Sequence, residues 1–371
     1  MKYCKSCVQP DTRPGIQFNE EGICPACQYM DKAQDIDWEE RNKELQRIVE
    51  FGKSQNVSGY DCIIGVSGGK DSTRLSMYVR DELGMKPLLV SCMFPPEQQS
   101  ECGAHNLGNL ISLGFDTIAV GPAPETWKKL MRQGFLKYGN HCKSTEMALY
   151  ACLPRAAIAY HIPLIFLGEN PAIQLGDLGV GSMTWDGNKM KYSNTIASGP
   201  DDLILPGMTE QDIIWYRYPS DEEMVMAKIQ IVYLGYFWKN FTKPDNAAFA
   251  MSHGLDIRDE IPENMGALYP FEALDEDFVF VNQMMKYIKL GFGKMTDDVS
   301  EQVRFDYMPR EKALDLVKRY DGNCAGEYIK KYCHYLGITE EKFWQVAEKF
   351  RNQSIWEKDA NGEWELKAPL E

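Results

Sequence analysis

The sequence predicts an α/β protein built on a doubly wound parallel sheet, with a cysteine-rich segment before it and a helical region after it. Three observations support this fold class. Short apolar runs alternate with amphipathic stretches over residues 62–167, which is typical of strands joined by crossover helices. Four cysteines lie close together near the N-terminus, and helical periodicity dominates beyond residue 262. We therefore expect three parts, residues 1–35, 36–260 and 261–371.

The composition is that of a globular protein. Of 371 residues, 44% are hydrophobic and 25% are charged, and the apolar runs are too short to span a membrane. The N-terminus lacks the pattern of a signal peptide, so we expect a cytoplasmic protein without a membrane partner. Fifty-four acidic against forty basic residues leave a net charge of −14, which disfavours nucleic acid as a partner.

The N-terminal cysteines have the spacing of a metal site. Two C-x2-C pairs are separated by sixteen residues, and they comprise Cys4, Cys7, Cys24 and Cys27. This spacing fits a closed zinc ribbon with four thiolate ligands, which leaves no position for a substrate. An iron–sulfur cluster uses the same ligands, and four free thiols are the other alternative. The odd total of eleven cysteines without an export signal argues against a disulfide framework.

The expected elements follow in order along the chain. A charged helix over 38–51 links the ribbon to the sheet. Buried strands are expected where the apolar runs are continuous, at 62–64, 87–93, 116–120, 162–167 and 229–237. Helices are expected at 75–83, 107–111, 127–135 and 147–160, after Pro244, and at 278–290, 296–305, 309–319, 324–336 and 340–350. The tail from residue 356 has little periodicity.

A glycine-rich stretch separates the first strand from the first crossover helix. It reads Gly65, Val66, Ser67, Gly68, Gly69, Lys70, Asp71, Ser72. Its glycines allow a tight turn that brings backbone N–H groups close to an anion, and the helix N-terminus adds its dipole. The stretch lacks the spacing of the Walker A loop and of the Gly-x-Gly-x-x-Gly dinucleotide loop. It therefore predicts a pyrophosphate-binding loop of another kind, with an ordinary glycine-rich turn as the alternative.

Other candidates follow later strands, because parallel sheets bind ligands beyond the carboxyl ends of their strands. Gly168, Glu169 and Asn170 come after the strand at 162–167. A carboxylate there suits magnesium and an amide suits ribose or phosphate oxygen, unless the segment is a plain turn. Ser91 ends an earlier strand and either lines the nucleotide or packs in the core.

Three further features lie outside the strand ends. Lys143 is a candidate for binding a phosphate, with an exposed lysine as the alternative. Cys142 with Cys152 is a candidate sulfur-carrying pair, although Cys152 falls within a helical pattern and more readily packs in the core. The segment 176–200 is rich in Gly, Asp and Ser and is either an active-site lid or a surface loop.

The loop carries a family resemblance. Ser-Gly-Gly-Lys-Asp-Ser at 67–72 resembles the loop of the PP-loop ATP pyrophosphatases, which split ATP into AMP and pyrophosphate while adenylating a carbonyl oxygen. Combined with the cysteine ribbon, it is similar over nearly the whole chain to the N-acetyl sugar amidotransferases of that group. The C-terminal part of this resemblance is Gly291-Phe292-Gly293, Arg304 and Tyr320-Asp321-Gly322.

The resemblance implies a sheet of the adenine-nucleotide alpha-hydrolase (PP-loop/HUP) type and a specific reaction. The enzyme would convert an acetamido group of a bacterial surface sugar into an acetamidino group, as in lipopolysaccharide O-antigen biosynthesis. The sugar would be nucleotide-linked or a nonulosonic acid. The cofactors would be ATP and Mg2+, besides the Zn2+ of the ribbon.

The resemblance also implies roles for individual residues. Lys70 and Lys143 would neutralise phosphate charge, and Asp71 and Glu169 would hold magnesium, while the backbone and hydroxyl groups of the loop would grip pyrophosphate. We find no glutaminase constellation in the sequence, so ammonia would come from solution or from a separate glutaminase with a cyclase-like subunit. The alternatives are a PP-loop tRNA thiolase, which needs a basic face and reactive cysteines, and a nucleotide-binding regulator without turnover.

Overall fold

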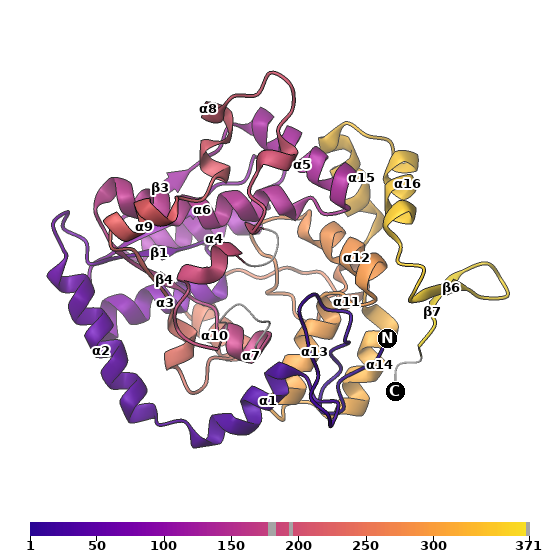
Figure 1. Ribbon diagram of the computed structural model, residues 1–371, viewed down its shortest axis with the longest axis horizontal. Coiled ribbons are helices and arrows are strands. Elements are labelled where there is room, and N and C mark those ends of the chain that lie inside the picture. The colour runs from indigo at the N-terminus through magenta and orange to yellow at the C-terminus, as the bar shows by residue number, and fades with distance from the viewer. Residues whose placement is uncertain (177–182, 193–195, 369–371) are drawn as a thin grey trace.

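Five short parallel strands form the central sheet of the protein, which we describe from a computed structural model over residues 1–176, 183–192 and 196–368 (Figure 1). In the order β3-β2-β1-β4-β5, the strands are Thr117–Val120, Pro87–Cys92, Cys62–Gly65, Leu164–Leu167 and Gln230–Tyr233. Ile64 of β1 pairs with Leu89 on one side and Phe166 on the other. The chain adds β2 and β3 on one side of β1 and β4 and β5 on the other, so strand order reverses between β1 and β4. This topology confirms the predicted doubly wound fold, whose ligands bind at that reversal.

Both faces of the sheet are covered, which explains the continuous apolar runs. Side chains alternate along each strand, so Ile63 joins one core while Cys62 and Ile64 join the core on the opposite face. The first core contains α5 (Pro124–Tyr138) and α6 (Cys142–Tyr160). The second contains α2 (Trp38–Ser54), α3 (Lys70–Met77) and α4 (Glu101–Ser112).

Shorter helices lie between β4 and β5 and between β5 and the C-terminal region. They are α7 (Pro171–Gln174), α8 (Glu210–Ile213), α9 (Asp221–Met226), α10 (Lys243–Met251) and α11 (Pro262–Met265). The longer helices that follow are α12 (Val279–Leu290), α13 (Lys294–Arg304), α14 (Arg310–Tyr320), α15 (Gly326–Leu336) and α16 (Glu340–Phe350). None of the helices within the described ranges is both long and apolar enough to cross a bilayer.

The C-terminal helices make two different contacts. Helices α12, α15 and α16 share the core of α5 and α6, where the ring of Phe343 stacks 5.2 Å from that of Phe135. Helices α13 and α14 instead pack on the N-terminal segment, with Val8 buried against Met295 and Val299 (Figure 1). The helical region therefore bridges the cysteine-rich segment and the sheet.

Local details differ from the sequence-based expectation where distant residues intervene. Helix α13 begins at Lys294, earlier than expected, because the carboxylate of Asp321 accepts hydrogen bonds from the N–H groups of Gly293 (2.8 Å) and Thr296 (3.3 Å). The second cysteine pair opens a helix, α1 (Pro25–Lys32), and the tail forms a hairpin of β6 (Trp356–Lys358) and β7 (Trp364–Leu366). The last sheet strand ends at Tyr233.

Candidate functional site

The glycine-rich loop joins β1 to α3 and is shaped by close packing. Gly68 has a φ of +84°, and a Cβ atom there would lie 2.6 Å from the backbone nitrogen of Leu107 on α4. Only glycine fits this position without strain. Gly69 is the N-cap of α3 and provides no side-chain cap, and its carbonyl accepts a hydrogen bond from the hydroxyl of Ser72 (3.1 Å). The first-turn N–H groups of α3 are thus left for an anion.

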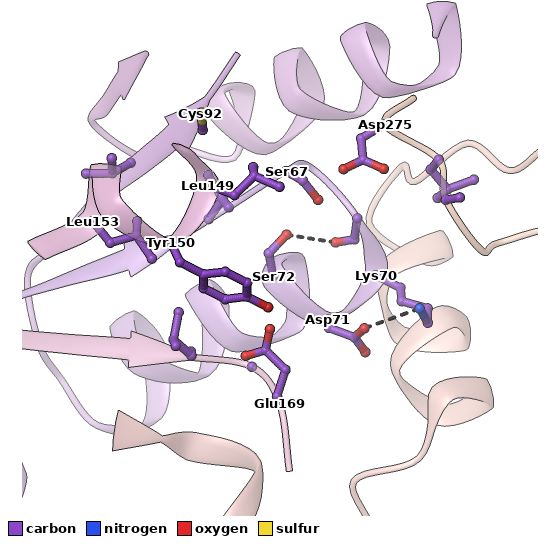
Figure 2. Close-up of a pocket in the computed structure, with 18 of the residues that line it drawn as sticks. Ser67, Lys70, Asp71, Ser72, Cys92, Leu149, Tyr150, Leu153, Glu169 and Asp275 are labelled. Carbon is purple, nitrogen blue, oxygen red and sulfur yellow. Dashed lines mark hydrogen bonds and ion pairs between the residues drawn. The ribbon is translucent and has the colours of Figure 1, made fainter. Parts of the chain in front are cut away.

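A cavity of about 300 Å³ lies over this loop at the reversal of strand order (Figure 2). Its walls come from the loop, the end of β4, helix α6 and the segment that begins at Phe271. The volume is at the lower end of the range for small-molecule sites. Nine of the predicted site residues line it, namely Gly65, Val66, Ser67, Gly69, Lys70, Asp71, Ser72, Gly168 and Glu169.

The side chain of Lys70 is held by two carboxylates. Its Nζ lies 3.2 Å from Oδ2 of Asp71 and 3.6 Å from Oε1 of Glu272, and only 7% of the residue is exposed. Burial alone would lower the pKa of Lys70, but the charges of Asp71 and Glu272 hold it above the usual range. The ammonium group is therefore charged and fixed in position at the cavity.

Glu272 belongs to a buried network of charges. Its carboxylate also lies 2.9 Å from Nζ of Lys294 and 3.6 Å from Nζ of Lys243, and Lys243 contacts Asp298 at 2.7 Å. Burial alone would raise the pKa of Glu272, but Lys294, Lys70 and Lys243 bring it well below the usual range. The network connects α3, α10 and α13 beside the cavity.

Two carboxylates at the cavity have the properties of magnesium ligands. Figure 2 shows Asp71 in the first turn of α3 and Glu169 just beyond the end of β4, with the hydroxyl of Tyr150 directed toward Glu169. Burial, with a smaller effect of Asp71, raises the pKa of Glu169 to about 6. Its Oε2 atom is buried and has no hydrogen-bond partner among the described residues. An unpaired buried carboxylate oxygen beside a second carboxylate fits a hard cation.

Four of the predicted residues do not line the cavity. Gly68 packs on α4, and Ser91 is buried within β2. Asn170 caps α7 and donates a hydrogen bond to the carbonyl of Gly235 (3.0 Å). Lys143 lies 2.5 Å from the hydroxyl of Ser198. Part of the expected lid at 176–200 lies outside the described residues, and the roles assigned to individual residues stay predictions.

Sequence reasoning missed several residues that line the cavity. Tyr150 and Leu153 come from α6, where helical spacing made them indistinguishable from core residues. Asp275 faces Ser67 from a segment without periodicity, and burial raises its pKa above the usual range. Its only signal is the run of acidic residues over 272–277.

The four N-terminal cysteines converge as their spacing predicts. All are buried, with Sγ atoms 3.9 Å apart for Cys4 and Cys27 and 3.7 Å apart for Cys7 and Cys24. The backbone N–H of Cys24 also points at the sulfur of Cys4 (3.2 Å). These sulfur atoms lie within 4.8 Å of one another and fit a tetrahedral ion.

Arg304 connects the cysteine cluster to the cavity. One guanidinium nitrogen lies 3.7 Å from the sulfur of Cys7, and the other donates to the carbonyl of Gln174 (3.3 Å), which lines the cavity. A cation at this position offsets the excess negative charge of a four-thiolate zinc site. Gly176, just beyond α7, packs so closely that a Cβ atom there would lie 2.3 Å from the nitrogen of Ala26.

Comparisons with known proteins add evidence for the C-terminal region. Residues 272–370 match the family model of the LPS biosynthesis protein WbpG-like C-terminal domain. This match fits a PP-loop amidotransferase family, as the loop and the ribbon predict. The solved structure of NMN synthetase from Francisella tularensis is similar at 14% identity, over 52% of this chain and 93% of that one, with a TM-score of 0.26. No curated protein sequence matches the chain.

Proposed function

We propose that the protein is an ATP-using enzyme of LPS biosynthesis, and specifically a sugar amidotransferase that forms AMP and pyrophosphate. One observation carries the proposal. The phosphate loop and the first residues of the WbpG-like region line the same cavity, and Lys70 of the loop is paired with Glu272 of that region. The glycine-rich loop and the region matched by the WbpG-like family model thus contribute to one cavity, which supports a single site that uses both.

The proposed reaction has two steps. The oxygen of the sugar's acetamido group attacks the α-phosphorus of ATP and forms an O–P bond. The bond between the α-phosphorus and the oxygen that bridges the α- and β-phosphates then breaks, which releases pyrophosphate. Ammonia then adds to the activated carbon, whose C–O bond breaks as AMP leaves with the electron pair. The product is an amidinium cation, and one ammonia proton passes to solvent.

The chain's own residues bind and orient the reactants in this scheme. The N–H groups at the start of α3 and the hydroxyl groups of Ser67 and Ser72 would contact the pyrophosphate part of ATP. Lys70, held by its two carboxylates, would offset the charge that develops on the leaving group. Asp71 and Glu169 would hold Mg2+, which supplies charge neutralisation at the phosphates.

The nitrogen source and the cellular context form part of the same proposal. We propose that ammonia is delivered by a glutaminase with a cyclase-like subunit, and that the substrate is an acetamido sugar of a bacterial surface polysaccharide. The negative net charge of −14 is in line with a sugar substrate in preference to a polyanion such as tRNA.

The test is a product assay with the purified chain. The protein is incubated with ATP, Mg2+, ammonium and a panel of acetamido sugars. We expect pyrophosphate and AMP in equal amounts, dependent on one class of sugar, and a product whose mass shows replacement of oxygen by an NH group. ATP breakdown that is independent of every sugar in the panel would contradict the proposal.

One observation favours a second candidate, a PP-loop thiolase. Cys92 and Cys152 both line the cavity and interact with each other. The neighbouring Cys92 thiol and burial together raise the pKa of Cys152 well above its usual range, so its thiol stays protonated and is a poor sulfur carrier. Because pyrophosphate leaves before the second nucleophile attacks, the test must follow the final product. Full product formation by a Cys152→Ser variant would exclude a covalent sulfur-carrying role for this residue.

A further inference from the structure

His141, Cys142 and Glu276 form a second cluster of metal-ligating side chains. One ligand atom from each lies within 4.8 Å of the other two, and all three residues are buried. Ligand atoms on one tetrahedral zinc ion are about 3.3–3.8 Å apart, because metal–ligand distances are about 2.0–2.3 Å. Small adjustments of these side chains are therefore enough to hold an ion.

The buried imidazole of His141, which has no hydrogen-bond partner within the described part of the chain, is the observation that most directly indicates a metal ligand. The residue is 0% exposed, and neither ring nitrogen has a hydrogen-bond partner among the described residues. Its ring lies against that of Tyr332, with centroids 4.9 Å apart. Burying two polar nitrogens without partners is costly, and native structures rarely do so. Burial lowers the pKa of His141 to about 3, so the imidazole is neutral, which is the form that binds metals.

Cys142 and Glu276 complete a mixed donor set. One carboxylate oxygen of Glu276 accepts a hydrogen bond from the N–H of Phe278 (2.6 Å), which fixes the orientation of the group. Burial raises the pKa of Glu276 to about 8 and that of the Cys142 thiol well above its usual range. A bound dication would reverse both effects, because it stabilises the thiolate and the carboxylate directly.

A cysteine–histidine–glutamate triad is the other chemistry that these residue types allow. Such a triad needs a hydrogen bond between the imidazole and the thiol, and both ring nitrogens of His141 lack one. Cys142 is buried and does not line the cavity of Figure 2, so a substrate carbonyl has no access to it from there. The arrangement favours coordination over nucleophilic catalysis.

We propose that His141, Cys142 and Glu276 bind one divalent transition-metal ion, namely zinc, with water as the fourth ligand. Nitrogen, sulfur and oxygen ligands together are typical of zinc. The ion would tie the start of α6 to the segment before α12. Asp275, the residue next to Glu276, lines the cavity, so the ion would also hold that wall of the cavity in place.

Metal analysis of the full chain, purified without chelator, tests the proposal. We expect about two zinc ions per wild-type chain, one in the ribbon and one here. Cys142→Ser and His141→Ala should each lose about one equivalent while the ribbon zinc stays. Cys333→Ser is the matched control, since Cys333 is a buried thiol outside this cluster, and it should keep both ions.

Zinc X-ray absorption spectroscopy of the wild-type protein tests for the second zinc site without the use of any variant, so it does not depend on whether a variant folds. With both sites filled, five sulfur ligands are shared by two ions and nitrogen or oxygen scatterers appear in the first shell. A pure four-sulfur shell, or a Cys142→Ser variant that retains all of its metal, would overturn the proposal. Co2+ substitution gives an independent reading, because the thiolate charge-transfer band should weaken in Cys142→Ser and persist in Cys333→Ser.

Discussion

The carboxylate of Glu272 lies 3.6 Å from the ammonium of Lys70, although the two residues are far apart in the sequence. Lys70 follows the first strand of the sheet, whereas Glu272 begins the WbpG-like region. The same carboxylate contacts Lys243 and Lys294. The position of the loop lysine is thus set by a residue that no local pattern connects to the loop.

Replacing Glu272 tests this relationship. Glu272→Gln removes the one carboxylate that contacts all three buried lysines, so we expect a loss of about 3 kcal/mol in the free energy of unfolding. We also expect slower pyrophosphate release, because Lys70 loses one of its two fixed partners. Urea unfolding and the product assay measure the two effects. The exposed Glu263→Gln is the control, and equal behaviour of the two variants would contradict the prediction.

The loop residues themselves should be essential. Lys70→Ala and Asp71→Asn each remove a group that lines the cavity, and we expect pyrophosphate release to fall by about 100-fold or more, equivalent to about 3 kcal/mol of transition-state stabilisation. Far-ultraviolet circular dichroism should stay unchanged. Lys330→Ala, at an exposed position on α15, controls for loss of a lysine. Near wild-type turnover in either loop variant would mean that the loop is structural.

Magnesium dependence should vary with pH through Glu169. The pKa of this carboxyl is raised to about 6 from an ordinary value of 4.5, so the group loses its charge as pH falls through about 6. We expect the Mg2+ concentration for half-maximal activity to rise as pH falls through this range. Titrations with Mg2+ at several pH values measure it. Glu169→Gln should need a high Mg2+ concentration for half-maximal activity at every pH. If this concentration varied with pH in the same way for the variant and the wild type, Glu169 would not be the magnesium ligand.

The cysteine ribbon should bind zinc and support the fold. Cys4→Ser should lose about one zinc equivalent, the one assigned to the ribbon, and should melt at a lower temperature. Metal analysis and thermal unfolding provide the measurements, with Cys62→Ser, a buried thiol outside the cluster, as the control. A visible iron–sulfur absorption in freshly purified protein would show that these ligands bind an iron–sulfur cluster and not zinc.

The nitrogen source distinguishes a lone enzyme from one that works with a partner. The isolated chain should use ammonium at high concentration and ignore glutamine, because we assign no glutamine-hydrolysing group to it. Glutamine should become a substrate when a glutaminase partner is added. Labelled nitrogen in the product, traced from ammonium or from glutamine, measures both. Efficient transfer from glutamine by the chain alone would show that a nucleophile has been overlooked.

The sheet and the loop were predictable because their signals are local. Continuous apolar runs such as 87–92 reflect burial on both faces, and the glycine at 68 reflects a turn with a positive φ that favours glycine. The four-cysteine site was equally predictable, because the spacing of the ligands within each C-x2-C pair is visible in a short stretch of sequence. These features were enough to predict the fold class and most of the residues on the cavity wall that the glycine-rich loop forms.

The opposite wall was not predictable, because it depends on tertiary contacts. Asp275 reaches the cavity from a segment without periodicity, and Tyr150 comes from a helix whose spacing is that of any buried helix. The cap of α13 by Asp321 has the same origin, since a carboxylate distant in the sequence accepts the hydrogen bonds at the start of this helix. A single sequence contains no pattern that reports such pairs.

The packing of the ribbon against α7 connects the four cysteines to the wall of the cavity, so a change in the metal state of these cysteines would reach the cavity. Gly176 leaves no space between the two segments, and Arg304 connects the sulfur of Cys7 to the backbone of Gln174. Oxidation of the thiols would eject zinc, remove the anion that Arg304 neutralises and release the end of α7. Oxidative or chelating stress would therefore slow turnover from outside the cavity, without any competitor for ATP.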